Sequence, residues 1–177
     1  MPNTKTAENI DPIAFLDRLA PGFKDLVKEQ IAIMHFSLLW GYFEGKALDT
    51  NASADRIIAI THEWSSKKCL QYERFAKHLE YFRQRYFRKG VEKSKFQKLH
   101  LRRNDSPDLV RKVLIGENTD PADCVAVLLI VILRLRNNLF HGIKWQDELR
   151  GQLENFQHAN AILMAAIETY QECHTMR

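Results

Sequence analysis

The chain has 177 residues, of which 45% are hydrophobic and 27% are charged, with seven glycines and five prolines. This length and composition are typical of one globular domain and exclude collagen-like and wholly disordered chains. The formal net charge is only +4, but the positive side chains are gathered. Between Lys67 and Arg103 there are 13 basic and three acidic residues, a local charge of +10, whereas the rest of the chain carries −6.

The three cysteines, Cys69, Cys124 and Cys173, contain no CxxC spacing. Their odd number predicts neither a disulfide framework nor a four-cysteine zinc site, and a reducing compartment fits best. The first residues lack the apolar core of a signal peptide, and the longest apolar run, 124–133, is shorter than the roughly 20 residues of a membrane span. We therefore expect a cytoplasmic protein with no membrane segment.

The first predicted elements are helical. A short segment, 11–19, ends at Pro21-Gly22, a dipeptide that breaks helices. Apolar residues then recur every three or four positions from 23 to 42, which predicts a long helix. Gly41 and Gly45 lie one turn apart and indicate close helix packing, within the chain or across a dimer. The second long segment, 53–87, has one apolar seam that we assign to the core: Tyr72, Phe75, Leu79, Phe82 and Tyr86.

Residues 88–106 are rich in positive charge and have no long periodic pattern, so we expect a mobile basic loop there. Ser106 and Pro107 have the character of a helix cap and first helical residue, and open a short helix. The same start signal recurs at Asp120, Pro121 and Asp123. The helix that follows is almost wholly apolar from 124 to 133, so we expect it to be buried. It stops at Gly142, a common residue just past a helix end.

A last amphipathic helix, about 149–170, completes an all-α bundle of four long helices plus one or two short helices. We expect residues 1–22 to form an N-terminal extension with a short helix. Residues 23–177 would then form a single helical domain that carries the basic loop at about 88–106.

The buried helix ends in the string RNNLFHG, residues 136–142. Asn137 and His141 are four residues apart and share one helical face, so Asn137 can orient the imidazole. His141 lies at the negative end of the helix dipole, which favours its protonated form and keeps it in the range of proton transfer. Arg136 offers a planar fork of donors to phosphate oxygens, and Lys144 follows as a further cation.

This string resembles the signature of the HEPN superfamily, small α-helical bundles marked by an Arg, four to six residues and then a His. The loose spacing occurs three times in the chain, so the resemblance depends on the whole string, its position at the end of a buried helix and the helix that follows. It covers roughly residues 23–172 in architecture. It implies a metal-independent endoribonuclease without cofactor, of the kind found among toxins and among defence or stress effectors.

The resemblance also implies roles for the residues. Cleavage by the 2′-hydroxyl of RNA needs a base, an acid and positive charge on the phosphorane. His141 would be the acid or base, Arg136 would bind the phosphorane, and Asn137 would position the imidazole or the phosphate. One motif supplies one histidine, so a homodimer with a composite active site is implied.

Seven further side chains are expected to bind RNA or its phosphates: Lys144, Asn138, Lys89, Lys93, Lys95, Arg102 and Arg103. The resemblance also implies an antitoxin or other regulatory protein as a partner. In HEPN toxins paired with nucleotidyltransferase antitoxins, a Tyr two residues after the His is modified, but Ile143 occupies that position. The sequence therefore does not support control by adenylylation there.

Two other functions stay open. A non-catalytic bundle of the same fold would bind RNA or a protein through its basic surface. A purely structural subunit would use Arg136 and His141 only as cations at a helix end, with Arg136 paired to a nearby acidic residue. The remaining histidines have no HExxH or Cys-His spacing, and no P-loop or GxGxxG string is present, so we expect no metal and no nucleotide cofactor.

Overall fold

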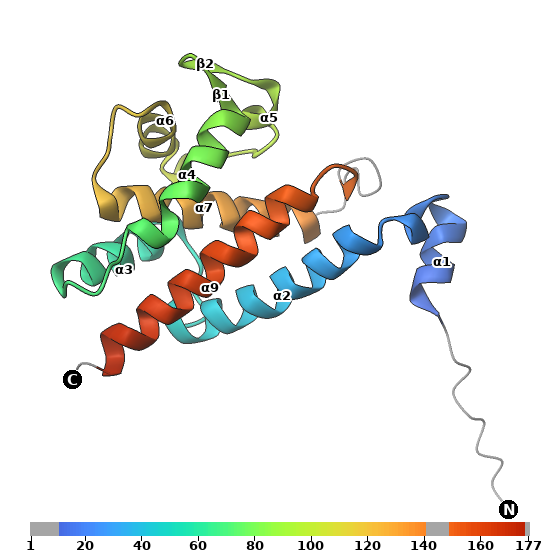
Figure 1. Ribbon diagram of the computed structural model, residues 1–177, viewed down its shortest axis with the longest axis horizontal. Helices are drawn as coiled ribbons and strands as arrows, with labels where there is room; N and C mark the ends of the chain where they lie inside the picture. Colours follow the sequence, from blue (N-terminus) through green and yellow to red (C-terminus); the bar gives the residue numbers. More distant parts are fainter. Residues whose placement is uncertain (1–10, 141–148, 176–177) are drawn as a thin grey trace, which may run out of the picture.

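A computed structural model describes residues 11–140 and 149–175 of the chain (Figure 1). The predicted all-α class is confirmed, because helices dominate the described residues and the two strands have two residues each. The α-helices in chain order are α1 (Pro12–Leu19), α2 (Val27–Ala47), α3 (Ala54–Ser66), α4 (Glu73–Tyr86), α5 (Ser94–Gln97), α6 (Pro107–Ile115), α7 (Pro121–Phe140) and α9 (Leu153–Thr175). The shorter elements are the 3-10 helices η1 (Phe23–Asp25) and η2 (Arg103–Asp105) and the strands β1 (Phe87–Arg88) and β2 (Val91–Glu92).

Helix α7 is the central element of the bundle, as its apolar sequence predicts. Every residue from Cys124 to Leu133 is buried. Helix α3 packs against it, α4 and α6 also contact it, and α2 and α9 lie side by side (Figure 1). Fully burying one aliphatic side chain is worth about 1.5–3 kcal/mol. The run 124–133 therefore contributes a large part of the core.

Helices α6 and α7 begin at the prolines that the sequence predicts, but only α7 has the predicted side-chain cap. Asp120 caps α7 as predicted, since its Oδ1 accepts the backbone N–H of Asp123 at 3.0 Å. Pro107 opens α6, also as predicted. The cap expected from Ser106 is wrong, because its backbone has φ 51° and its side chain makes no capping hydrogen bond. A capping residue needs an extended backbone to reach the first N–H groups of the helix.

The second predicted segment is divided into two helices, α3 and α4. Lys68 adopts φ 59°, and the N–H of Cys69 bonds to the carbonyl of Trp64 at 3.0 Å, which ends α3. Residues 67–72 contain neither Gly nor Pro, so composition does not signal this break. The predicted core seam of α4 is confirmed at its buried residues, Phe75, Leu79, Phe82 and Tyr86, and Tyr72 is half-buried.

The basic segment 88–106 does not form the loop that the sequence predicts. Strands β1 and β2 form an antiparallel hairpin in which Phe87 pairs with Glu92, and α5 and η2 follow it. Phe96 and Leu99 are buried in the main core. These two apolar side chains dock the segment on the bundle, although its many charges hide them in the sequence pattern.

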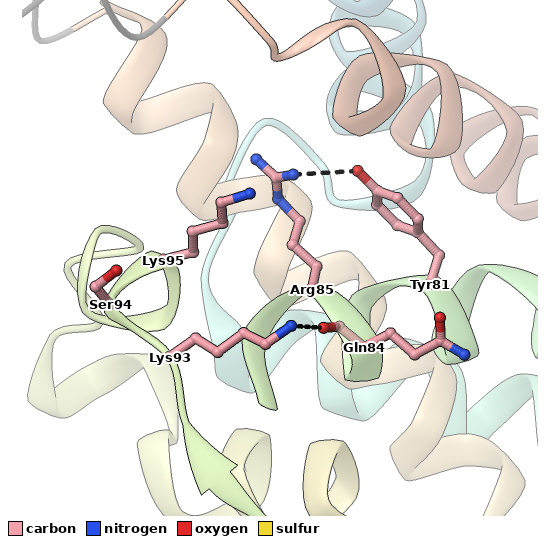
Figure 2. Close-up of a pocket in the computed structure, with 6 residues that line it drawn as sticks. All are labelled: Tyr81, Gln84, Arg85, Lys93, Ser94 and Lys95. Carbon is pink, nitrogen blue, oxygen red and sulfur yellow. Dashed lines mark hydrogen bonds between the residues drawn. The ribbon is translucent and has the colours of Figure 1, made fainter. Parts of the chain in front are cut away.

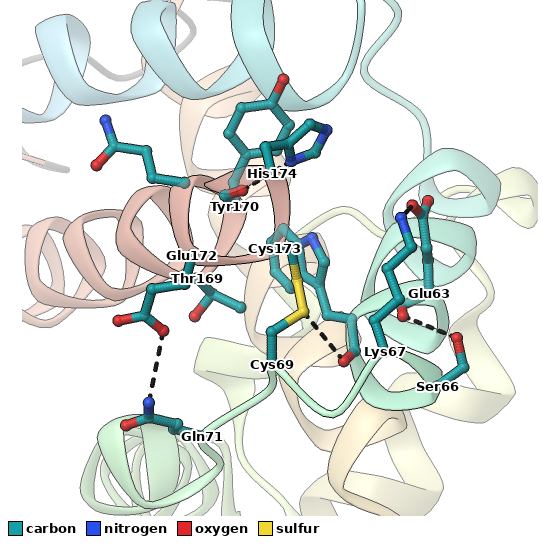
Figure 3. The surroundings of a disulfide bond; sticks show 12 residues. Glu63, Ser66, Lys67, Cys69, Gln71, Thr169, Tyr170, Glu172, Cys173 and His174 are labelled. Carbon is teal, nitrogen blue, oxygen red and sulfur yellow. Dashed lines mark hydrogen bonds and ion pairs between the residues drawn. A yellow bond between two sulfur atoms is a disulfide. The ribbon is translucent and has the colours of Figure 1, made fainter. Parts of the chain in front are cut away.

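Cys69 and Cys173 form a disulfide, so the expectation drawn from the cysteine count is wrong for this pair (Figure 3). Cys69 lies in the link between α3 and α4, and Cys173 lies in the last turns of α9, with their Cα atoms 5.6 Å apart. Tertiary packing brings the two residues together, which spacing along the chain does not reveal. Cys124 is free and buried. Within the described residues, no helix is both long and apolar enough to cross a membrane.

Candidate functional site

The motif begins in the last turn of α7. Arg136, Asn137 and Asn138 belong to that turn and are each half-buried. His141 and Lys144 lie outside the described residues, and the described helix ends at Phe140, directly before His141. The structure thus describes the arginine and amide half of the motif.

Arg136 is bound by an acidic side chain of α2. Its Nη2 lies 3.7 Å from Oε2 of Glu44, and its Nη1 donates to Oδ1 of Asn137 at 3.0 Å. Glu44 also accepts the indole N–H of Trp40 at 2.7 Å, which fixes the carboxylate. The Arg136 side chain is 37% exposed. The guanidinium is therefore oriented by protein groups, and part of the Arg136 side chain is open to solvent.

Asn138 and Arg134 hold the basic segment on α7. The Asn138 amide donates to the carbonyl oxygens of Lys98 and Leu99 at 3.0 and 3.3 Å. Arg134, four residues earlier on the same face of α7, donates from Nε to the same Leu99 carbonyl at 3.1 Å. The amide donors of Asn138, which we expected to contact RNA, thus have backbone partners in the protein.

Arg134 also forms a buried ion pair that sequence reasoning missed. Its Nη1 lies 3.4 Å from Oδ2 of Asp105, and both side chains are buried. Burial lowers the pKa of the Arg134 guanidinium, and the Asp105 carboxylate opposes that effect. An arginine directly after an apolar run was the available signal, because a buried charge needs a partner. The pair joins η2 to α7 and so fixes the second end of the basic segment.

The other basic residues predicted to bind RNA lie on this docked segment. Within the described part of the chain, Lys89, Lys95, Arg102 and Arg103 are exposed and form no ion pair with a carboxylate. Lys93 is half-buried, and its ammonium donates to the carbonyl of Gln84. The surface is therefore positively charged and attached to a rigid helical frame.

Part of this surface is a pocket of about 460 Å³ between α4 and the residues at the start of α5 (Figure 2). Arg85 donates from Nη1 to the Tyr81 hydroxyl at 3.4 Å and from Nη2 to Gln152 at 3.4 Å. The lining contains three cations, two hydroxyl groups and one amide, and no carboxylate: Tyr81, Gln84, Arg85, Lys93, Ser94 and Lys95. Such a set suits an anion that accepts several hydrogen bonds, such as a phosphate. Sequence reasoning named the two lysines but missed Arg85 and Tyr81, which share one face of α4.

Two histidines lie beside Tyr81 and were not predicted to meet. Nδ1 of His78 is 2.8 Å from Nδ1 of His158, and the His158 ring stacks on Tyr81 with centroids 3.8 Å apart. One ring nitrogen must donate and the other accept, so the accepting ring is neutral. Burial lowers the pKa of His78 to about 4 and also lowers the pKa of His158. The pair is therefore a neutral packing contact between α4 and α9.

One group of described residues has metal-ligand chemistry. The ligand atoms of His62, Asp120 and Asp123 lie within 4.8 Å of one another. Nε2 of His62 bonds to Asp123 at 2.8 Å, and Asp120 caps the start of α7. These contacts explain the cluster as the N-terminal end of a helix, where carboxylates are favoured.

Comparison with protein-family models, with curated proteins and with solved structures finds no match for this chain. The functional proposal therefore depends on the motif at the end of α7 and on the basic surface beside it.

Proposed function

We propose that this protein is a metal-independent endoribonuclease that cleaves RNA by attack of the 2′-hydroxyl on the adjacent phosphate. The observation that carries the proposal is the RNNLFHG string at the C-terminal end of the buried helix α7. The string places an arginine, two amides and a histidine together where the most apolar helix ends. These residue types can supply the cation, the hydrogen-bond donors and the proton-transfer group that the reaction needs.

In this proposal, His141 transfers the proton of the 2′-hydroxyl or of the leaving 5′-oxygen. Arg136 donates two hydrogen bonds to the phosphate as negative charge develops on its oxygens. Asn137 holds the Arg136 guanidinium, to which its amide oxygen is bonded at 3.0 Å. A second copy would bring a second His141 into a composite cleft, as the resemblance to HEPN proteins implies.

The ion pair with Glu44 is compatible with phosphate binding by Arg136. The pair has an Nη2–Oε2 distance of 3.7 Å and a partly exposed arginine, so it is weaker than a bidentate contact. A phosphate can accept two hydrogen bonds from the same guanidinium. We expect the phosphate of RNA to compete with Glu44 for Arg136.

The basic surface would hold the RNA near the motif. Asn138 and Arg134 attach the basic segment to the motif-bearing helix through the Leu99 carbonyl. Lys93, Lys95 and Arg85 would then bind backbone phosphates in the pocket at α4 and α5. A cytoplasmic toxin, defence or stress role, with an antitoxin or regulatory protein as partner, belongs to the same proposal because the resemblance to HEPN proteins implies it.

The second candidate is a non-catalytic RNA-binding bundle. The observation that favours it is the ion pair between Arg136 and Glu44, since a purely structural arginine would make the same contact. The basic surface serves this function equally well.

The two functions are separated by incubating the purified protein with RNA in EDTA. We compare the wild type with Arg136→Ala and His141→Ala, and use Lys46→Ala on the exposed end of α2 as a matched control. The endoribonuclease proposal predicts cleavage by the wild type and the control, loss of cleavage in both motif variants, and no cleavage of DNA, which lacks the 2′-hydroxyl. RNA binding without cleavage by the wild type would establish the second candidate.

A further inference from the structure

One face of α2 carries an apolar seam that the described residues of the chain leave largely exposed. Val27, Ile31, Met34 and Leu38 follow one another at steps of four, three and four residues, and Tyr42 lies beside the seam. These five side chains are between 46% and 68% exposed. The opposite face of α2 is buried against α9 and the core (Figure 1). Helix α2 is thus apolar on both faces, whereas a surface helix is normally polar on its outer face.

The seam continues into two glycines. Gly41 and Gly45 extend the same alternation of three and four residues, so the seam has the heptad period of paired helices. A Cβ added at either glycine would meet nothing within 4 Å, so neither is required by packing within the described chain. Of the two packing partners expected for these glycines, a close contact within the described residues is not found, which leaves the contact across a dimer. Glycine is the poorest helix former after proline, so two in one helix indicate close approach by a surface other than the described residues.

We propose that a second copy of this chain packs on the seam, with the two α2 helices antiparallel about a two-fold axis. The large side chains lie in the N-terminal half of the seam and the glycines in its C-terminal half. An antiparallel pair centred between Met34 and Leu38 sets Ile31 of each copy over Gly41 of the other. It also sets Val27 over Gly45, so each large side chain meets a position without one.

The residues beside the seam suit the same arrangement. Lys28, His35 and Tyr42 repeat every seven residues along one flank. In an antiparallel pair, the flank of one helix faces the same flank of the other, so Lys28 lies beside the partner's Tyr42. An ammonium against a tyrosine ring is favourable, and the symmetry provides this contact twice.

The exposed apolar area of the α2 seam can be compared with the area that protein interfaces bury. The five apolar side chains together expose on the order of 500 Å², the size of the largest apolar patches on monomers, which are often functional. Polar side chains on both flanks of a helix about 31 Å long add the rim of the interface. A stable pair of standard size buries about 800 Å² on each partner. The seam and its rim are therefore of a size that can form an interface between two copies.

This dimer is carried by α2 alone and does not depend on RNA cleavage. Glu44, which binds Arg136, lies eight residues from the centre of the seam, or about 12 Å along the helix axis. The two Glu44–Arg136 pairs of the dimer would therefore be about 24 Å apart along the seam. A composite cleft would need a contact elsewhere, at the end of α7.

Sedimentation equilibrium of the full chain tests the proposal. We expect the wild type to be a dimer, and Leu38→Asp and Gly41→Leu to be monomers with unchanged helical content, because both positions are exposed. Met164→Asp, at a 49% exposed site on α9, is the matched control and should remain a dimer. A monomeric wild type would overturn the proposal. A dimeric Leu38→Asp protein would overturn it as well, and would place the contact between the copies elsewhere, as the composite cleft at the end of α7 requires.

Cysteine cross-linking tests the direction of the helices. In an antiparallel pair, the Ile31→Cys/Gly41→Cys variant cross-links to a covalent dimer under mild oxidation. The single Ile31→Cys variant does not, because its two thiols would be about 15 Å apart along the seam. Cross-linking of the single variant would contradict the antiparallel arrangement.

Discussion

Removal of the disulfide between Cys69 and Cys173 should lower the stability of the fold by a large and calculable amount. The two cysteines are 104 residues apart in the chain. In the chain-entropy model, a bond that closes a loop of about 100 residues stabilises the folded state by about 4.7 kcal/mol, because it restricts the unfolded chain. For a protein of this size, that loss corresponds to a fall of roughly 10–20 °C in the midpoint of thermal unfolding.

The assay is thermal unfolding followed by circular dichroism, for the oxidised wild type, the wild type in dithiothreitol and the Cys69→Ser/Cys173→Ser variant. We expect the oxidised protein to unfold at the highest temperature. The reduced protein and the variant should unfold together well below it, and dithiothreitol should not affect the variant. Equal midpoints for oxidised and reduced wild type would refute the reasoning. So would three reactive thiols in the unfolded protein after purification without reductant.

Three further predictions concern other contacts. Asp105→Ala leaves the buried Arg134 without its carboxylate, so urea unfolding should show a loss of about 3–5 kcal/mol, and a loss below 1 kcal/mol would contradict the buried pair. The pKa of His78 is held at about 4 in the fold. The unfolded chain, with a histidine pKa near 6.5, binds more protons between those values, so the free energy of unfolding should fall as the pH falls from about 6.5 to about 4. His78→Phe should make that dependence shallower, and an unchanged slope would contradict the assignment. Lys93→Gln/Lys95→Gln should weaken RNA binding and reduce the slope of log affinity against log salt by about 1.4, whereas Lys46→Gln should leave both unchanged; an unaffected slope would exclude the pocket as a phosphate site.

The sequence predicted those elements that depend on neighbouring residues alone, such as an apolar run or a helix cap. The apolar run 124–133 predicted the buried position of α7, and Asp120 with Pro121 predicted its start. The break between α3 and α4 was missed because no Gly or Pro marks it. The docking of residues 88–106 was missed because Phe96 and Leu99 are two apolar residues in a strongly charged stretch.

Contacts between distant residues could not be predicted in the same way. The Arg136 side chain stands where the motif predicted, at the end of α7, but its partner Glu44 belongs to another helix. His78 and His158 are 80 residues apart, and the two cysteines of the disulfide are farther apart still. Each pair depends on how whole helices pack, and the residue types alone allow many pairings.

The exposed seam of α2 shows that the sequence pattern of a helix does not always reveal which face packs on the core. Its spacing is that of an ordinary amphipathic helix, and the sequence could not tell which apolar residues face the core. Only the buried set, Ala32, Phe36 and Trp40 among them, reveals that Ile31 and Leu38 belong to the other face.

The chemical identity of the RNA ends after cleavage in EDTA tests the central claim most directly. Attack by the 2′-hydroxyl expels the 5′-oxygen, so the upstream product must carry a 2′,3′-cyclic phosphate and the downstream product a 5′-hydroxyl. Mass spectrometry of the products distinguishes these ends from the 3′-hydroxyl and 5′-phosphate left by attack of water. We predict cyclic phosphate ends from the wild type and none from Arg136→Ala or His141→Ala. Cleavage by the wild type that leaves 3′-hydroxyl ends, or cyclic phosphate ends formed equally by His141→Ala, would contradict the proposed mechanism.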